Sequence, residues 1–135
     1  MQRMMTIAAA TLLSLAGCNA TPTTSMSSAG LTDGQYCFRQ TTTGNGVTDV
    51  AELLITVSGA SASGAYNWLP QEKDQRRGTF TGKVSGSRIA ASYQFSQEGQ
   101  TTTADIAITV SDTTATIEGG APELGLAATL PKVGC

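Results

Sequence analysis

The segment from residue 70 to residue 78 gathers charged side chains in a chain that otherwise carries few. It reads Pro-Gln-Glu-Lys-Asp-Gln-Arg-Arg-Gly and lies between two expected strands. Guanidinium groups pair with carboxylates or phosphates through two parallel hydrogen bonds, and aromatic side chains just before the segment can supply an apolar surface beside them. We therefore predict a binding loop formed by Tyr66, Trp68, Glu72, Lys73, Asp74, Arg76 and Arg77. The alternatives are a solvated loop whose charges keep the protein soluble, and a Trp68 that packs in the core.

Three carboxylates raise the question of catalysis. Glu72, Asp74 and Glu98 are of the type that cleaves glycosidic bonds in pairs, but nothing in the sequence fixes their separation. The chain contains no His, which excludes His-activated nucleophiles and His metal sites. The glycines lack the Lys-Ser/Thr ending of a phosphate-binding loop. We therefore expect no catalytic residue, no metal and no cofactor.

The length and the charge of the chain limit the number of domains and exclude one class of partner. The chain has 135 residues, enough for one domain, and its 8 basic and 10 acidic side chains give a net charge of −2. The basic residues are scattered, so the chain lacks the basic patch that binds nucleic acid.

The first eighteen residues have the pattern of an export signal. One basic residue, Arg3, precedes an apolar run from Met4 to Leu15, which is too short to span a bilayer. The following Leu-Ala-Gly-Cys at residues 15–18 resembles the lipobox of bacterial lipoproteins. The resemblance implies removal of residues 1–17, lipidation of Cys18 and stable anchoring through several acyl chains. Asn19 after the cysteine implies delivery to the outer membrane, with the domain in the periplasm.

The chain after Cys18 divides into a tether and one domain. Residues 19–33 are small, polar and without periodicity, so residues 18–33 are expected to form a lipidated flexible tether, reaching about 20 Å. Residues 34–135 form the expected β-domain. Its two cysteines, Cys37 and Cys135, are predicted to form a disulfide because an exported protein meets an oxidising compartment.

Alternation of apolar and polar residues recurs along the domain. The runs include Leu53-Ile55-Val57, Ile89-Ala91-Tyr93-Phe95, Ile106-Ile108-Val110 and Leu124-Leu126-Ala128-Leu130. Period two over four to eight residues predicts strands, and Gly-, Asn- and Ser-rich turns separate the runs. The sequence therefore predicts an all-β domain, a small antiparallel meander barrel or sandwich of about eight strands with one disulfide.

Two further resemblances concern residues 59–120. Glu72-Lys73-Asp74, the run 78–82 (Gly-Thr-Phe-Thr-Gly), the run 91–95 (Ala-Ser-Tyr-Gln-Phe), Glu98-Gly99 and the run 118–120 (Glu-Gly-Gly) resemble a pattern in small uncharacterised envelope lipoproteins, which implies no known activity. The run 61–66 (Ser-Ala-Ser-Gly-Ala-Tyr) resembles a loop of periplasmic inhibitors of c-type lysozyme, but it lies earlier in the chain than in that family.

These observations favour an outer-membrane lipoprotein without catalytic activity, held to the membrane by its N-terminal lipid. It would act as a binding or envelope-structural module, with an envelope protein as one possible partner. One alternative is a lysozyme inhibitor. Another is a calycin-like barrel that binds a small ligand in a cavity lined by Tyr36, Phe80, Tyr93 and Phe95.

Overall fold

The computed structural model describes Gly17 and residues 30–135. Cys18, the predicted lipidation site, lies outside the described residues, as do most of the predicted signal peptide and most of the predicted tether. The described part of the chain contains no helix that is both long enough and apolar enough to cross a membrane.

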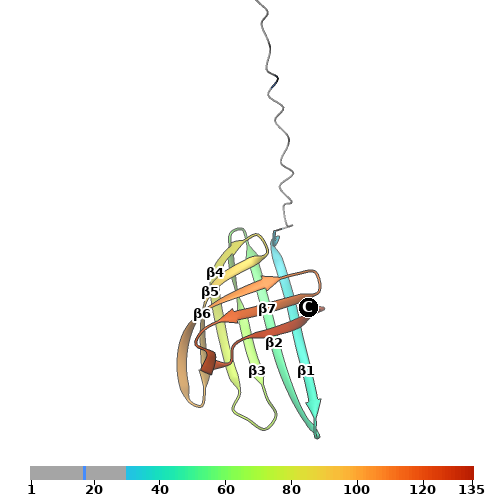
Figure 1. The fold of residues 1–135 in the computed structure, drawn as a ribbon, viewed down its shortest axis with the longest axis vertical. Helices are drawn as coiled ribbons and strands as arrows, with labels where there is room; N and C mark the ends of the chain where they lie inside the picture. The colour runs from blue at the N-terminus through green and yellow to red at the C-terminus, as the bar shows by residue number, and fades with distance from the viewer. Residues whose placement is uncertain (1–16, 18–29) are drawn as a thin grey trace, which may run out of the picture.

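Eight antiparallel strands follow one another around a closed barrel, each paired with its neighbours in the sequence, and β8 returns to β1 (Figure 1). The elements are β1 Gly34–Gly44, β2 Val47–Ser58, β3 Ser61–Leu69, β4 Arg76–Ser85, β5 Arg88–Gln97, β6 Gln100–Val110, β7 Thr114–Gly119, the 3-10 turn η1 Pro122–Leu124, and β8 Ala128–Val133. The predicted all-β class is confirmed, and the barrel is the architecture that the chain adopts.

Short turns set the order of the strands. Asn45 and Gly46 both have positive φ angles, as do Glu98 and Gly99, which is the backbone of the tight turns that match strand twist. A turn at residues 86–87 likewise joins β4 to β5. Such two-residue turns pair consecutive strands directly, and the longer connections 70–75 and 120–127 join β3 to β4 and β7 to β8, so the strands form a meander.

The expected period-two faces supply the core of the barrel. Inward residues alternate with exposed ones along β5, where Ile89, Ala91, Tyr93 and Phe95 are buried. One predicted run was wrong in part: Leu124 belongs to η1, and β8 begins only at Ala128. Pro122 starts the 3-10 turn and Gly125 ends it in the left-handed region, so the apolar alternation before residue 128 is not that of a strand.

Glycines on the inner face make room for aromatic rings. A Cβ at Gly64 would overlap the Leu54 carbonyl oxygen and lie 2.8 Å from Phe80 Cζ. A Cβ at Gly78 would lie 2.5 Å from Tyr93 Cε2. An eight-stranded barrel is just wide enough for side chains to fill, so small residues opposite large rings let the interior pack.

The shortest ladder of paired residues in the barrel joins β1 to β8, and we call this contact the β1–β8 seam. These strands pair only at Cys37–Val133 and Phe38–Lys132 in the described chain, whereas β1 and β2 pair along their whole lengths. The disulfide between Cys37 and Cys135 crosses this seam with a Cα–Cα distance of 5.4 Å, which is ordinary for such a bond. The predicted disulfide is confirmed, and it joins the first strand to the last residue.

The two ends of the barrel differ. At the upper end in Figure 1, the chain enters β1, Leu31 N donates to Gly86 O at 3.0 Å, and the Leu31 side chain packs against the core. We call the opposite end, formed by the turns at 45–46, 70–75 and 98–99 and by residues 120–127, the open end. Residues 34–133 contain all eight strands of the barrel, and Leu31 packs against their core from the segment before β1.

Candidate ligand-binding site

A cavity of about 660 Å³ lies at the open end of the barrel. Its inner wall is formed by Tyr66, Trp68, Arg76 and Phe95, which come from β3, β4 and β5. Cavities that hold small ligands commonly measure about 300–1,000 Å³ and combine apolar walls with a few convergent polar groups. The volume of this cavity lies within that range, and its lining combines these inner residues with the polar side chains Gln40, Thr42, Gln97, Gln100 and Thr102.

Arg76 is the one charged residue buried among the described residues, with 4% of its surface exposed. It is the first residue of β4. Inward and outward side chains alternate along this strand, so Arg76, Gly78 and Phe80 face inward and Arg77 faces outward. Its Nη1 donates to the backbone oxygens of Leu124 at 3.2 Å and Gly125 at 3.3 Å. Its buried Nε has no hydrogen-bond partner.

No carboxylate neutralises this guanidinium. All ten acidic residues of the chain lie within the described range, and the ion pair formed there joins Arg39 to Glu52. Arg76 lies over three aromatic rings instead, with Cζ at 5.2 Å from the ring centre of Tyr66, 5.8 Å from that of Trp68 and 5.9 Å from that of Phe95. Cation–π contacts of this kind contribute about 0.5–2 kcal/mol each, which offsets only part of the cost of burying a charge.

The nearby tyrosines remain neutral and do not compensate Arg76. Burial raises the pKa of Tyr93 to about 12 and also raises the pKa of Tyr66, although the Arg76 charge acts in the opposite direction on both. Tyr93 donates its hydroxyl to Tyr66 O at 2.6 Å, and Tyr66 donates to Leu126 O at 3.1 Å. At neutral pH the inner wall therefore carries a single positive charge.

Residues 124–126 are held at the open end by donors from inside the barrel. Arg76 binds the carbonyls of Leu124 and Gly125, and Tyr66 binds the next carbonyl, that of Leu126. Three consecutive carbonyls therefore accept hydrogen bonds from the inner wall. These bonds fix the position of η1, which contributes Glu123 to the lining of the cavity.

Acidic residues line the outer part of the same cavity. Asp49 is half-buried on β2, Glu98 lies exposed in the β5–β6 turn, and Glu123 lies exposed on η1. We call these three residues the rim acids. Asp49 Oδ1 accepts a hydrogen bond from Gln71 N at 3.3 Å, and none of the three forms an ion pair within the described chain.

The structure separates the residues of the predicted binding loop. Tyr66, Trp68 and Arg76 come together in the cavity, whereas Glu72, Lys73 and Asp74 are exposed on the 70–75 connection outside its lining. The two arginines belong to β4 rather than to the loop, and they face opposite ways. Arg77 points outward and donates to Gln75 Oε1 at 2.9 Å and 3.3 Å.

The cavity also differs from the one expected of a calycin-like barrel. Of the four aromatic residues named for it, only Phe95 lines the cavity at the open end. Phe80 and Tyr93 are buried in the core, and Tyr36 lies near the other end, where its hydroxyl donates to Thr32 O at 2.8 Å. The run 61–66, which resembles a lysozyme-inhibitor loop, lies within β3, and inhibition of lysozyme stays a prediction.

The sequence interpretation missed Glu123 and the carbonyls of residues 124 and 125. Their signal was the Pro122 and Gly125 pair, which favours a short turn over a strand. Glu98 was predicted as part of a lipoprotein pattern and weighed as a catalytic carboxylate, not as a ligand-binding residue. It lines the same cavity as Glu123, and no local pattern of the sequence indicates that the two share a cavity.

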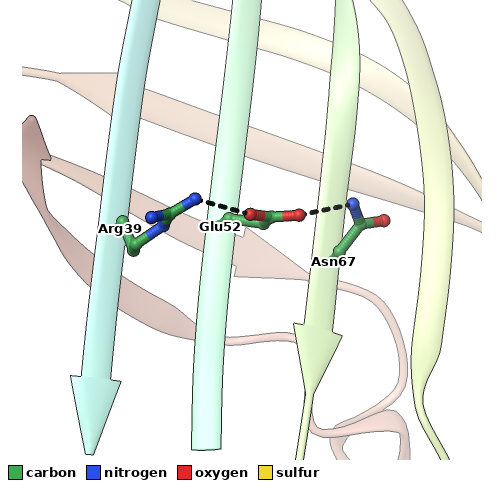
Figure 2. A network of polar contacts seen from close by, with 3 residues as sticks. All are labelled: Arg39, Glu52 and Asn67. Atoms are coloured by element: carbon green, nitrogen blue, oxygen red, sulfur yellow. Dashed lines mark hydrogen bonds and ion pairs between the residues drawn. The ribbon is translucent and has the colours of Figure 1, made fainter. Parts of the chain in front are cut away.

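A second polar cluster lies on the outer surface and is better explained by structure than by ligand binding. Glu52 accepts hydrogen bonds from Arg39 on β1 at 3.3 Å and from Asn67 on β3 at 3.2 Å, so it joins three neighbouring strands (Figure 2). The side chains of Arg39 and Glu52 are 58% and 33% exposed. Exposed pairs of this kind contribute about 0–1 kcal/mol to stability.

The cavity residues at the open end can bind an anionic group through Arg76. Among the described residues, they do not form an acid and base pair around a position where a substrate is known to react. The part of the chain that the structure describes contains no group of three His, Cys, Asp or Glu residues able to hold a metal ion. Comparisons of the chain with protein-family models, with curated proteins and with solved structures found no match.

Proposed function

We propose that this protein is a lipid-anchored envelope protein whose barrel binds a small ligand carrying a negative charge. The ligand occupies the cavity at the open end, and its anionic group pairs with Arg76. The protein acts by binding rather than by catalysis. The observation that carries the proposal is the buried guanidinium, which has no carboxylate partner among residues 30–135, where all ten acidic side chains lie.

The energetics of burial support an anionic ligand. A charge removed from water without a counter-charge costs several kcal/mol, and backbone carbonyls and aromatic rings compensate only part of this cost. An anion beside Arg76 supplies the missing charge and meets a guanidinium already held in place. Preorganisation of this kind favours binding because the ordering cost is met when the protein folds.

The position of the cavity supports a role at the end of a tether. The chain joins the barrel beside Gly86, at the end opposite the cavity. If Cys18 carries the lipid, residues 19–33 connect the membrane to the end of the barrel that lies opposite the open end. The mouth of the cavity can then face away from the membrane, toward ligands dissolved in the periplasm.

Isolation of the protein with its ligand tests the proposal. The lipidated protein would be purified from envelopes under mild conditions and analysed by native mass spectrometry for bound drug-sized compounds, the class of ligand that cavities of this volume hold. The variant is Arg76→Met, and the matched control is Arg77→Met, which removes the same type of side chain from the adjacent outward position.

We expect the unchanged protein and Arg77→Met to retain the same anionic compound, and Arg76→Met to lose at least nine-tenths of it, about 1.4 kcal/mol in affinity. Retention of that compound by Arg76→Met would refute the role of the guanidinium. Capture of a compound without an anionic group would refute the proposed ligand class.

A further inference from the structure

The inner part of the cavity carries a positive charge, and its outer part carries negative charges. Arg76, on the inner wall, is the only basic residue among those that line the cavity. The rim acids Asp49, Glu98 and Glu123 come from three separate segments around the same cavity. A ligand that enters therefore meets negative charge first and positive charge at the inner end.

This polarity discriminates among ligands of different charge. A simple anion gains contact with Arg76 but is repelled by three carboxylates as it enters. A simple cation is attracted to the rim and repelled by the buried guanidinium. A molecule with an anionic group at one end and a cationic group at the other satisfies both depths at once, and like-charge contacts reject the alternatives.

Aromatic rings surround the inner charge of the cavity. Tyr66, Trp68 and Phe95 lie around the Arg76 guanidinium and line the cavity, and the amide and hydroxyl side chains of Gln40, Thr42, Gln97, Gln100 and Thr102 complete its lining. Rings of this kind pack against a flat or apolar body. The part of the ligand next to its anionic group is therefore expected to be flat and apolar.

We propose that the cavity selects a zwitterionic ligand, an amine-bearing carboxylate that binds with its carboxylate toward Arg76 and its ammonium group toward the rim acids. The inference rests on the proposed function and specifies its ligand class. It also assigns a specificity role to Glu98 and Glu123, which the sequence interpretation did not connect with each other.

Three molecules of nearly the same shape separate the possibilities. 4-(Aminomethyl)benzoate carries both charges, 4-methylbenzoate carries only the carboxylate, and 4-methylbenzylamine carries only the ammonium group. Trp68 is the single tryptophan of the chain and lies in the cavity, so its fluorescence reports binding directly. The chain from residue 19 onward contains the whole barrel and serves as the protein.

We expect 4-(aminomethyl)benzoate to bind about two- to fivefold more tightly than 4-methylbenzoate, the range typical of exposed charge pairs, and the amine to show no saturable binding. The double variant Glu98→Gln/Glu123→Gln should lose most of this preference, with Asp49 keeping a small remainder, while Arg76→Met should bind neither carboxylate. Added salt should reduce the preference for the zwitterion, because the rim is exposed.

The outcomes separate this inference from the proposed function. Equal binding of the two carboxylates to the unchanged protein, abolished by Arg76→Met, would overturn zwitterion selection and leave the anion site standing. A preference for the zwitterion that removal of both rim glutamates does not diminish would overturn their role. If no carboxylate binds at millimolar concentration, or if the amine binds most tightly, both proposals fail.

Discussion

The disulfide that crosses the β1–β8 seam should hold a large share of the stability of the domain. The change that tests this is the double variant Cys37→Ala/Cys135→Ala, which removes the bond and leaves no free thiol in the folded unit. In the folded state the bond joins residues 98 positions apart, so it encloses nearly the whole barrel sequence. A crosslink across such a long loop acts mainly by restricting the unfolded chain.

The chain-entropy relation for a loop of about 100 residues gives a loss of about 4.7 kcal/mol at 25 °C. Domains of this size are stable by about 5–15 kcal/mol in total, so the variant should lose a third or more of its stability. The seam adds a local effect, since β1 and β8 share only the pairs at Cys37–Val133 and Phe38–Lys132 in the described barrel. Without the bond, this ladder should open before the longer ladders do.

Urea unfolding followed through Trp68 fluorescence measures the loss, and amide hydrogen exchange locates it. We expect the unfolding midpoint to fall strongly and the amides of β8 to exchange faster than those of β4 and β5. Reduction of the unchanged protein with dithiothreitol should reproduce both effects. A loss below about 1 kcal/mol, with β8 protection unchanged, would refute the reasoning and show that two backbone pairs suffice to close the seam.

The remaining predictions test packing, titration, charge burial and lipidation. Gly64→Ala should cost about 1–3 kcal/mol or more of unfolding free energy by overpacking, whereas Gly44→Ala, which meets nothing within 4 Å, should be neutral or slightly stabilising; similar midpoints in urea would contradict this. Because Tyr93 keeps its proton to a pKa of about 12 while an unfolded tyrosine loses it near its ordinary value of 10.0, the free energy of unfolding should fall by about 2–3 kcal/mol as pH rises from about 10 to about 12, and Tyr93→Phe should reduce that slope in alkaline urea titrations. Arg76→Met should change the unfolding free energy by no more than about 2 kcal/mol, because removal of a buried charge without a counter-charge offsets the loss of its two hydrogen bonds to Leu124 and Gly125; a loss above about 3 kcal/mol would contradict this balance. Cys18→Ser should abolish labelling by radioactive palmitate, and retained label would disprove lipidation at that residue.

The strand pattern was predictable because it depends on local alternation. The inner faces of β2, β5 and β6 follow the apolar residues of the sequence, and positive-φ turns appear where Asn-Gly and Glu-Gly pairs stand. The disulfide followed from cysteine number and export. The choice between a barrel and a sandwich could not be predicted in this way, because it depends on whether the last strand pairs with the first.

The position of Arg76 could be predicted from the local sequence pattern, but the sequence analysis placed this residue in a loop instead of a strand. Arg76, Gly78 and Phe80 alternate with period two, so the pattern of β4 extends back to Arg76 and places it inward. Charge favoured a loop over this extension, because buried arginines are rare. The position of Glu123 beside the same cavity had no such signal, because it depends on the hydrogen bonds that Arg76 makes to the following carbonyls.

The buried arginine links the shape of the cavity to its charge. Arg76 and Tyr66 together hold the carbonyls of residues 124–126, and this connection carries Glu123 at the cavity. A hydrophobic residue at position 76 could fill the barrel but could not donate to those carbonyls, so residues 120–127 would lose two of the three hydrogen bonds that side chains of the inner wall donate to them. The same side chain therefore supplies the positive charge of the inner wall and helps to position an acidic residue of the rim, which couples ligand charge to the order of residues 120–127.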